Sequence, residues 1–226
     1  MSADEIAAEA NDATIAKLLA AWEALIARHG TSPLGAEIGR ELLASWSEPH
    51  RRYHNIAHLD DVLRRVDELA AHAADLDAVL LAAWYHDAVY AGQPDDEENS
   101  ARRAETELTA LGLPPALIGE VVRLVRLTAT HDPARGDRNG QTLSDADLAI
   151  LAAPADRYAT YTAAIRAEYA HVPDDAFRSG RKQIVRRLLG GSGVYRTPRA
   201  RQHWEHRALA NLRAELGSLT APADHG

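Results

Sequence analysis

The sequence predicts an all-α fold in which the helices form one bundle, and three observations support this prediction. Apolar residues recur at the three- and four-residue spacing of helices along almost the whole chain. No segment shows the strict alternation of apolar and polar residues that a half-buried strand would have. Proline and glycine fall between the periodic segments, where helices begin and end. A length of 226 residues suits a single domain with a substantial core.

Turn and cap residues mark the ends of the first helices. Asn11 and Asp12 offer a cap for a first helix, and Gly30 ends it. Pro33 begins a second helix that carries Trp46. We expect residues 1–45 to pack as N-terminal helices on a core of about 46–216, in which a third helix begins within segment 51–58.

Segment 78–90 is apolar on every side and therefore predicts a buried central helix. It reads Ala-Val-Leu-Leu-Ala-Ala-Trp-Tyr-His-Asp-Ala-Val-Tyr, with His86 and Asp87 next to each other inside it. An unpaired buried carboxylate is costly, so it must become neutral or find a cation. From these two residues alone, two explanations stay open: a divalent metal ion, or a His-Asp pair that is hydrogen-bonded to the backbone.

The second half of the chain continues the helical pattern. Acidic residues at 95–98 favour the start of a fifth helix, which ends near Gly112. A sixth helix begins at Pro115 and ends near His131. Residues 134–143 are rich in Gly, Asp and Asn and predict an exposed loop. Further helices are expected at 144–151, 158–169, 174–189 and 198–216, followed by a frayed tail at 218–226.

Composition excludes several classes of protein. The chain has no cysteine, so it has no disulfide, no thiolate metal ligand and no cysteine nucleophile. Its net charge of -8 argues against a general nucleic-acid-binding protein. The N-terminus lacks the features of a signal peptide, and no apolar run reaches membrane-spanning length. We therefore expect a cytoplasmic protein that binds no membrane and no nucleic acid, with a homodimer left open.

Four predicted helices each place a histidine or an aspartate beside an apolar seam. His54 and His58 are four residues apart, so they share a face if their helix begins early enough. His131 closes one apolar helix, and Asp145 opens another, with its neighbour Asp147 pointing elsewhere. Imidazole and carboxylate groups from facing helices are how helical bundles build metal sites. Each residue also has an ordinary explanation, as a turn residue for His54 or as a helix-end charge for His131 and Asp145.

The order His58, His86-Asp87, Asp145 resembles the H…HD…D signature of the HD superfamily of metal-dependent phosphohydrolases. The surrounding sequence is similar to the bacterial branch described as predicted metal-dependent HD superfamily phosphohydrolases, over about residues 46–216. One departure is Asp96, which stands where that branch has asparagine. The matching segments are Arg-Arg-Tyr-His-Asn-Ile-Ala-His at 51–58, Trp-Tyr-His-Asp-Ala-Val-Tyr at 84–90, Glu97 with Ser100 and Ala101, Thr128 with His131, Asp-Ala-Asp-Leu-Ala-Ile-Leu at 145–151, Ile-Arg-Ala-Glu-Tyr at 165–169, and Gly180-Arg181.

This resemblance implies a metal centre and an enzymatic activity. The implied ligands of one divalent ion are His58, His86, Asp87 and Asp145. Histidine and carboxylate ligands leave Mn, Fe, Co, Ni, Zn and Mg open as the metal. The implied reaction is hydrolysis of a phosphate ester by a metal-activated water, and the substrate would be a nucleotide or another small phosphorylated metabolite.

Other residues near these motifs are candidates for catalysis and substrate binding. Glu97 is the candidate general base, or the residue that orients the water, although a charge at a helix start is its ordinary role. His54 and His131 are candidates to bind phosphate or to hold a second metal. By residue type, the candidate phosphate ligands are Arg51, Arg52, Arg166 and Arg181, of which the last two can equally pair with carboxylates such as Glu168.

Two other classes of function stay open. Some HD relatives carry two irons and use oxygen to cleave carbon bonds. They need additional histidines between the HD pair and the last aspartate, where this chain has only His131. The other class is a non-catalytic nucleotide-binding regulatory protein, whose site would have no reason to keep four costly buried groups. The fold alone does not choose among these classes.

Overall fold

Helices make up nearly all of the regular structure, as the sequence predicts. The computed structural model describes residues 3–220, with side chains from Asn11 onward, and this part contains eleven α-helices, two short 3-10 helices and no strand. The helices build one compact domain, which confirms the all-α prediction. Among the described residues, no helix combines the length and the apolar composition that crossing a bilayer requires.

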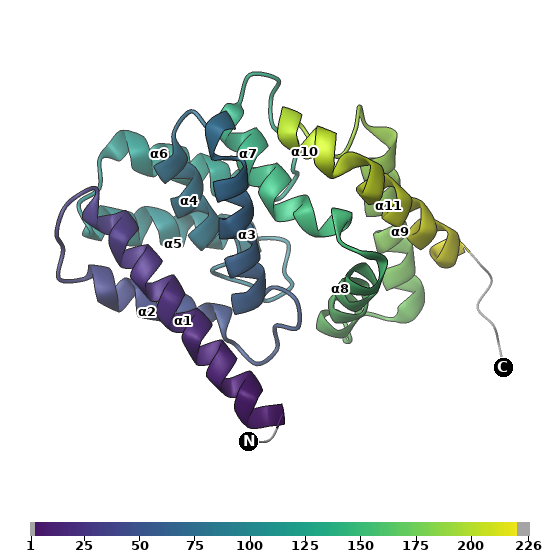
Figure 1. The fold of residues 1–226 in the computed structure, drawn as a ribbon, viewed down its shortest axis with the longest axis horizontal. Coiled ribbons are helices and arrows are strands. Elements are labelled where there is room, and N and C mark those ends of the chain that lie inside the picture. Colours follow the sequence, from purple (N-terminus) through teal and green to yellow (C-terminus); the bar gives the residue numbers. More distant parts are fainter. Residues whose placement is uncertain (1–2, 221–226) are drawn as a thin grey trace.

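The first seven helices form one side of the molecule (Figure 1). Helix α4 is their central member, and it packs against α3, α5, α6 and α7. The N-terminal helix α1 packs on α2 and α3. The bounds are α1 (Ala3–Ala27), α2 (Gly35–Trp46), α3 (Ile56–Glu68), α4 (Leu76–Tyr85), α5 (Asp96–Ala110), α6 (Pro115–Leu127) and α7 (Arg138–Asp147), with a 3-10 helix at Ala70–His72.

Helix α4 lies at the centre because its side chains are apolar on all faces. Every residue from 78 to 85 is buried except Leu80. Trp46 packs nearby, and its indole N–H donates to the carbonyl oxygen of Trp84 at 3.1 Å, so no polar group is left unpaired there. The predicted buried central helix is confirmed, but it ends at Tyr85 instead of Tyr90. The HD pair therefore lies in the turn that follows the helix.

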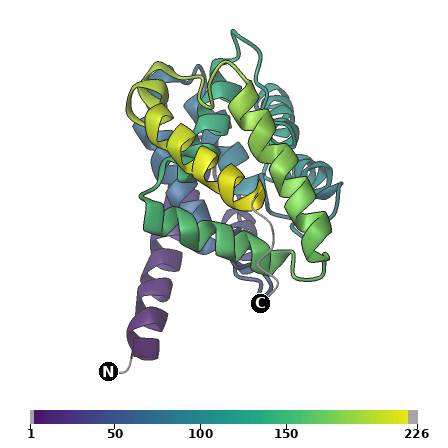
Figure 2. The same ribbon diagram turned by 90° about the vertical axis from the view of Figure 1, so that its right-hand side faces the viewer.

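The last four helices form the other side of the molecule, which Figure 2 views face on. Helix α11 packs against α9 and against the 3-10 helix Leu148–Ala152. Helix α9 is far less enclosed than α4, because Val185 is its one buried residue. The bounds are α8 (Ala155–Glu168), α9 (Asp174–Gly190), α10 (Pro198–His203) and α11 (Glu205–Thr220).

The segment expected to be an exposed loop, 134–143, instead leads into the buried helix α7. Asp137 caps this helix by accepting a hydrogen bond from the backbone N–H of Gly140 at 2.9 Å. Asn139 accepts from the backbone N–H groups of Ala74 and Asp75 at 2.9 and 2.8 Å. The expectation was wrong because these polar side chains satisfy buried backbone groups and not water. Residues 139 to 146 are all buried: Asn139, Gly140, Gln141, Thr142, Leu143, Ser144, Asp145 and Ala146.

Several helix ends also differ from the sequence-based expectation. Helix α1 already contains Asn11 and Asp12, so these residues do not cap it. Helix α6 ends at Leu127, before His131, and segment 198–216 is divided into α10 and α11 at Trp204. Helix α11 continues to Thr220, so the first residues of the expected frayed tail are helical, while 221–226 lie outside the described residues.

Candidate metal centre

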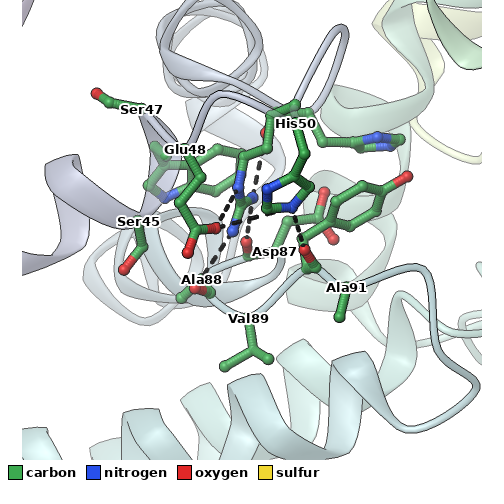
Figure 3. A network of polar contacts seen from close by, with 12 residues as sticks. Ser45, Ser47, Glu48, His50, Asp87, Ala88, Val89 and Ala91 are labelled. Atoms are coloured by element: carbon green, nitrogen blue, oxygen red, sulfur yellow. Dashed lines mark hydrogen bonds and ion pairs between the residues drawn. The ribbon is translucent and has the colours of Figure 1, made fainter. Parts of the chain in front are cut away.

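The turn after α4 is held by the loop between α2 and α3. The buried guanidinium of Arg51 donates to the carbonyl oxygens of Asp87 at 2.8 Å and His54 at 3.1 Å. A ring nitrogen of His50 lies 2.7 Å from the carbonyl oxygen of Tyr90. Figure 3 shows the loop and the turn facing each other across these contacts. Arg51 therefore holds the turn that carries the HD pair in place. We expected its guanidinium to bind phosphate, but it is engaged with backbone carbonyl oxygens instead.

Side chains from three helical segments converge beside this turn. The Nε2 atoms of His58 in α3 and His86 in the turn are 3.3 Å apart. Oδ1 of Asp147, at the end of α7, is 3.1 Å from Nε2 of His58 and 3.6 Å from Nε2 of His86. Oδ2 of Asp87 is 3.3 Å from Nε2 of His86 and 4.0 Å from Nε2 of His58. Two imidazoles and two carboxylates thus meet in a largely buried cluster.

These separations fit ligands that share one ion. Ligand atoms about 2.1 Å from an ion lie about 3.0 Å apart at a right angle and about 3.4 Å apart at the tetrahedral angle. The atoms of His58, His86 and Asp147 are 3.1 to 3.6 Å apart, which brackets the tetrahedral value. These three residues form a group that can hold a metal ion. Asp87 lies outside this group of three, although its Oδ2 is 3.3 Å from Nε2 of His86 and 4.0 Å from Nε2 of His58.

Asp147, and not Asp145, supplies the carboxylate from α7. Asp145 is fully buried, and its oxygens accept from the backbone N–H of Thr197 at 2.7 Å and of Arg196 at 2.9 and 3.0 Å. Burial raises the pKa of Asp145 to about 6, although these N–H groups oppose the shift. The expectation that Asp145 is a ligand and Asp147 points elsewhere is thus reversed. The reason lies in the distant partners, since Asp145 accepts backbone N–H groups of Arg196 and Thr197, whereas Asp147 faces His58 of α3.

Hydrogen bonds through Nδ1 orient two of the histidines. Nδ1 of His86 lies 2.9 Å from the carbonyl oxygen of Ala83, which can only accept, so Nδ1 donates and Nε2 is the nitrogen that faces the cluster. His131 approaches Ser144 Oγ with Nδ1 at 3.2 Å and Asp147 Oδ2 with Nε2 at 3.2 Å. His131 has a φ of 50°, a left-handed conformation that is uncommon for residues other than glycine and frequent at functional positions. The two oxygens of Asp147 therefore face different histidines.

The two carboxylates of the cluster stabilise positive charge in a buried site. Burial lowers the pKa of His58. Burial acts on His86 in the same direction, but Asp87 and Asp147 outweigh it and raise the pKa of His86 to about 9. Burial would raise the pKa of Asp147, but His86 and His58 hold it well below its usual range. A proton on His86 satisfies these carboxylates, and a bound divalent cation would satisfy them as well.

His54 lies outside α3, so it does not share a helix face with His58 as expected. The helix begins at Ile56, after Asn55, whose side chain caps it. The rings of His54 and His58 are nevertheless 5.5 Å apart. Glu168 at the end of α8 fixes His54, because its Oε1 accepts the backbone N–H at 3.0 Å and its Oε2 accepts Nδ1–H at 2.7 Å. Glu168 does not contact the other ring nitrogen of His54, Nε2, because its bond is to Nδ1.

Glu168 was not singled out from the sequence as a site residue. Burial would raise its pKa, but the partner His54 lowers it to about 2. Burial would lower the pKa of His54, but the hydrogen bond that His54 donates to Glu168 raises it. The signal that could have found Glu168 is its spacing, because it follows the buried residues Tyr161 and Ile165 on one face of α8.

Glu97 lies in the first turn of α5, near the carboxylates of the cluster. Burial raises its pKa, and the charges of Asp87 and Asp96 add to the shift. The neighbouring Asp96 is buried and accepts two backbone N–H groups of the loop before α5, at 2.8 and 2.9 Å. Asp96 therefore fixes the loop that leads from the HD pair to Glu97. The expected role of Glu97 as general base stays a prediction.

Two of the arginines expected to bind phosphate have partners within the fold. Arg166 donates to Oδ1 of Asp174 at 2.5 and 3.0 Å. Arg181 forms a two-point ion pair with Glu215 at 2.6 and 3.1 Å. Arg52 is exposed and lines a hollow of about 180 Å³ that also reaches His58. Long-range pairing therefore removes Arg166 and Arg181 from the substrate-binding candidates and leaves Arg52.

A cavity of about 460 Å³ opens onto the cluster from the side of α8 and α9. Its volume lies in the range of small-molecule sites. His54, His131 and Asp147 line its inner end, and one face of α9 forms part of its wall. Arg187 of α9 lines it too, is exposed, and makes no hydrogen bond or ion pair with any other residue that the structure describes. The sequence analysis missed Arg187, although it follows Ile184 at helical spacing.

Comparisons of the chain with known protein families, with curated proteins and with solved structures found no match. The candidate metal centre therefore rests on geometry. Three buried ligand atoms lie 3.1 to 3.6 Å apart, a second carboxylate lies within 4.0 Å of both histidines, and a cavity of small-molecule size opens beside them.

Proposed function

We propose that this chain is a metal-dependent phosphohydrolase of the HD superfamily that cleaves a phosphate ester of a small molecule such as a nucleotide. The observation that supports this most strongly is the convergence of His58, His86 and Asp147, with Asp87 beside them, at the end of a cavity. A divalent ion held there would lower the pKa of a bound water and polarise a phosphoryl oxygen. The order of these residues along the chain keeps the H…HD…D pattern, with Asp147 as its last member.

The surrounding residues have proposed roles in this reaction. Glu97 accepts the proton of the attacking water, because burial raises its pKa toward the working pH of a base. His54 is oriented by Glu168 through Nδ1, so its other ring nitrogen is available in the cavity to contact the phosphate or to protonate the leaving oxygen. Arg187 pairs with a phosphate oxygen, since its guanidinium has no partner among the described residues.

The test combines elemental analysis of the purified protein with a phosphate-release screen, in which each metal is added back to chelated protein. We expect one of the divalent metals to restore release from at least one phosphate ester. A metal-loaded protein that releases no phosphate from any nucleotide, sugar phosphate or alkyl phosphate would contradict hydrolysis.

Adjacent arginines on α9 offer a matched pair of variants for this screen. Arg187→Gln should raise KM about tenfold, because one charged hydrogen bond to the phosphate is lost. Arg186→Gln is the control, since Arg186 is exposed and does not line the cavity. Equal effects of the two substitutions would remove Arg187 from the site.

Oxidative chemistry with two metal ions is the second candidate, and one observation favours it. Oδ1 of Asp147 faces His58 and His86, whereas Oδ2 faces His131, so this carboxylate is placed to bridge two ions. Metal analysis separates the candidates, because the oxidative reading requires about two irons per chain and oxygen consumption with a substrate.

A further inference from the structure

The cavity beside the metal centre has two unlike ends. Its inner end carries His54, His131 and Asp147, which are polar or charged. Its outer wall is built by α8, α9 and the segment between them. The residues of that wall with no polar side-chain atom are Ile165, Val172, Ala176, Phe177 and Ile184. A ligand that fills the cavity therefore meets ligating and basic groups at one end and hydrocarbon at the other.

Ile184 is the clearest sign that this wall awaits an apolar group. Only two large hydrophobic side chains among the described residues are classed as exposed, Leu34 at 38% and Ile184 at 43%. Ile184 lines the cavity, whereas Leu34 does not. Along α9, Phe177, Gly180 and Ile184 recur at helical spacing on the cavity side. Helix α9 thus directs Phe177 and Ile184 toward the cavity, while Val185 is buried and Leu188 and Leu189 pack against the core.

Apart from Arg187, the polar side chains of the outer wall have partners within the fold. Arg181 is paired with Glu215 and also donates to the hydroxyl of Tyr161 at 3.2 Å. The hydroxyl of Tyr169 is hydrogen-bonded to Tyr90. A sugar or polyol placed against this wall would lose hydrogen bonds to water and gain few in return.

We propose that the substrate is a phosphate monoester whose organic part is an alkyl chain or a similar apolar group, lying between α8 and α9. This proposal rests on the proposed hydrolytic function. The phosphate lies at the inner end, within reach of Arg187, and the apolar body covers Phe177 and Ile184. Hydrolysis adds water across the ester: the water oxygen bonds to phosphorus, the P–O bond to the alkyl oxygen breaks, and that oxygen receives a proton.

Binding of phosphonates, which hydrolysis cannot cleave, tests the wall independently of turnover. Calorimetry on the metal-loaded protein compares methylphosphonate, hexylphosphonate and 2,3-dihydroxypropylphosphonate. We expect hexylphosphonate to bind at least about 60-fold more tightly than methylphosphonate, from about fourfold for each of three buried methylene groups. The dihydroxypropyl compound should gain nothing over methylphosphonate. Equal affinity for hexyl and methyl compounds, or a preference for the diol, would overturn the proposal.

Two matched substitutions test whether the preference for hexylphosphonate over methylphosphonate arises at α9. Ile184→Ser should reduce the hexyl-to-methyl affinity ratio about fivefold, because apolar contact area is lost. Leu34→Ser, at the other exposed large hydrophobic residue, should leave the ratio unchanged. Both positions are exposed, so neither change should unfold the protein. An unchanged ratio in Ile184→Ser would place the apolar body elsewhere and refute the assignment.

Turnover measurements then separate this proposal from the proposed function. Hexyl phosphate and glycerol 3-phosphate have similar leaving groups. The ratio of their kcat/KM values therefore measures how strongly the cavity wall prefers an alkyl chain to a polyol. Selective binding of hexylphosphonate without phosphate release from any ester would refute hydrolysis and leave the apolar wall standing. Release from both esters with equal kcat/KM would support hydrolysis and overturn the apolar substrate.

Discussion

Helices α4 and α9 use apolar side chains in opposite ways. In α4, seven of the eight residues from 78 to 85 are buried, and their contacts are with other helices of the same domain. In α9, one residue is buried, and Ile184 and Phe177 line an open cavity. The aromatic residues differ likewise. Trp22, Trp46 and Trp84 are enclosed around α4, whereas partly buried Phe177 and Tyr169 stand near α9.

We expect the region around α4 to determine stability and, under the proposed function, the region around α9 to determine ligand selectivity. The bundle around α4 fixes the turn with the HD pair, so ligand positions depend on dense packing. Helix α9 has one buried residue, so exposed residues that it presents to the cavity, such as Ile184, can change at small cost in stability. Substitutions in the two regions should therefore separate into effects on metal and folding, and effects on ligand choice.

The largest expected effect comes from the carboxylate that α7 places in the cluster. Asp147→Asn should abolish metal binding and phosphate release together, because the ion loses a charged ligand. Asp145→Asn should keep the metal but lower the melting temperature, since its oxygens accept backbone N–H groups of Arg196 and Thr197. Elemental analysis and thermal unfolding of both variants check this. The opposite pattern, with metal lost only in Asp145→Asn, would restore the ligand set expected from the sequence.

Next in size is the effect of Glu97→Gln, on the bundle side of the site. This change should lower kcat about 10²–10⁴-fold while metal stays bound, because the side chain keeps its shape and loses its basicity. The measurement is steady-state phosphate release at matched metal content. Full activity in the variant would move the role of base to His54 or His131.

Packing substitutions test the contrast between the two helices directly. Leu81→Ala in α4 should reduce the free energy of unfolding by about 2–5 kcal/mol, because Leu81 is fully buried. Ile184→Ala in α9 should change it by less than about 0.5 kcal/mol. Urea denaturation of both variants gives the comparison. A large loss of stability in Ile184→Ala would show that α9 belongs to the core and would weaken the contrast.

The smallest effect concerns the link between the regions, the Glu168–His54 pair. The pKa of Glu168 is about 2, below the ordinary value of about 4.3, so its stabilising contribution is present above pH 4.3 and is lost as pH falls from about 4.3 toward 2. Glu168→Gln should therefore cost up to about 3 kcal/mol at neutral pH and little near pH 2. Unfolding measured across this range checks the sign. A cost that persists unchanged at pH 2 would assign it to lost hydrogen-bond geometry and not to charge.

The sequence predicted the helical fold, and it pointed to two of the three residues that could hold a metal ion, His58 and His86, because both depend on local spacing. Apolar periodicity located α4, and the unusual polar pair that follows Tyr85 pointed to a site. It could not choose between Asp145 and Asp147, since each needs a partner from a distant segment. Asp145 meets backbone N–H groups some fifty residues later, and Asp147 meets His58 from α3.

Which arginines are candidates to bind phosphate could not be predicted for the same reason. Arginine type alone does not reveal that Arg51 holds the HD turn or that Arg181 is paired with Glu215. Arg187 carries no motif, and its place at the cavity appears only when α9 is set beside the cluster. Partners that are distant in the sequence determine which arginine side chains remain free to bind a ligand. The spacing of residues along one sequence contains little information about those partners.

Helix α7 has a consequence for mutational tolerance. It is among the most polar helices of the chain, yet eight consecutive residues in it are buried. Asn139, Gln141, Ser144 and Asp145 each bond a different residue outside the helix, so their side chains are specified one by one and not merely as polar. A scan of all substitutions would therefore find its intolerant positions in a stretch that hydropathy marks as surface. In evolution, this helix should drift more slowly than the apolar α4, where one hydrocarbon side chain can often replace another.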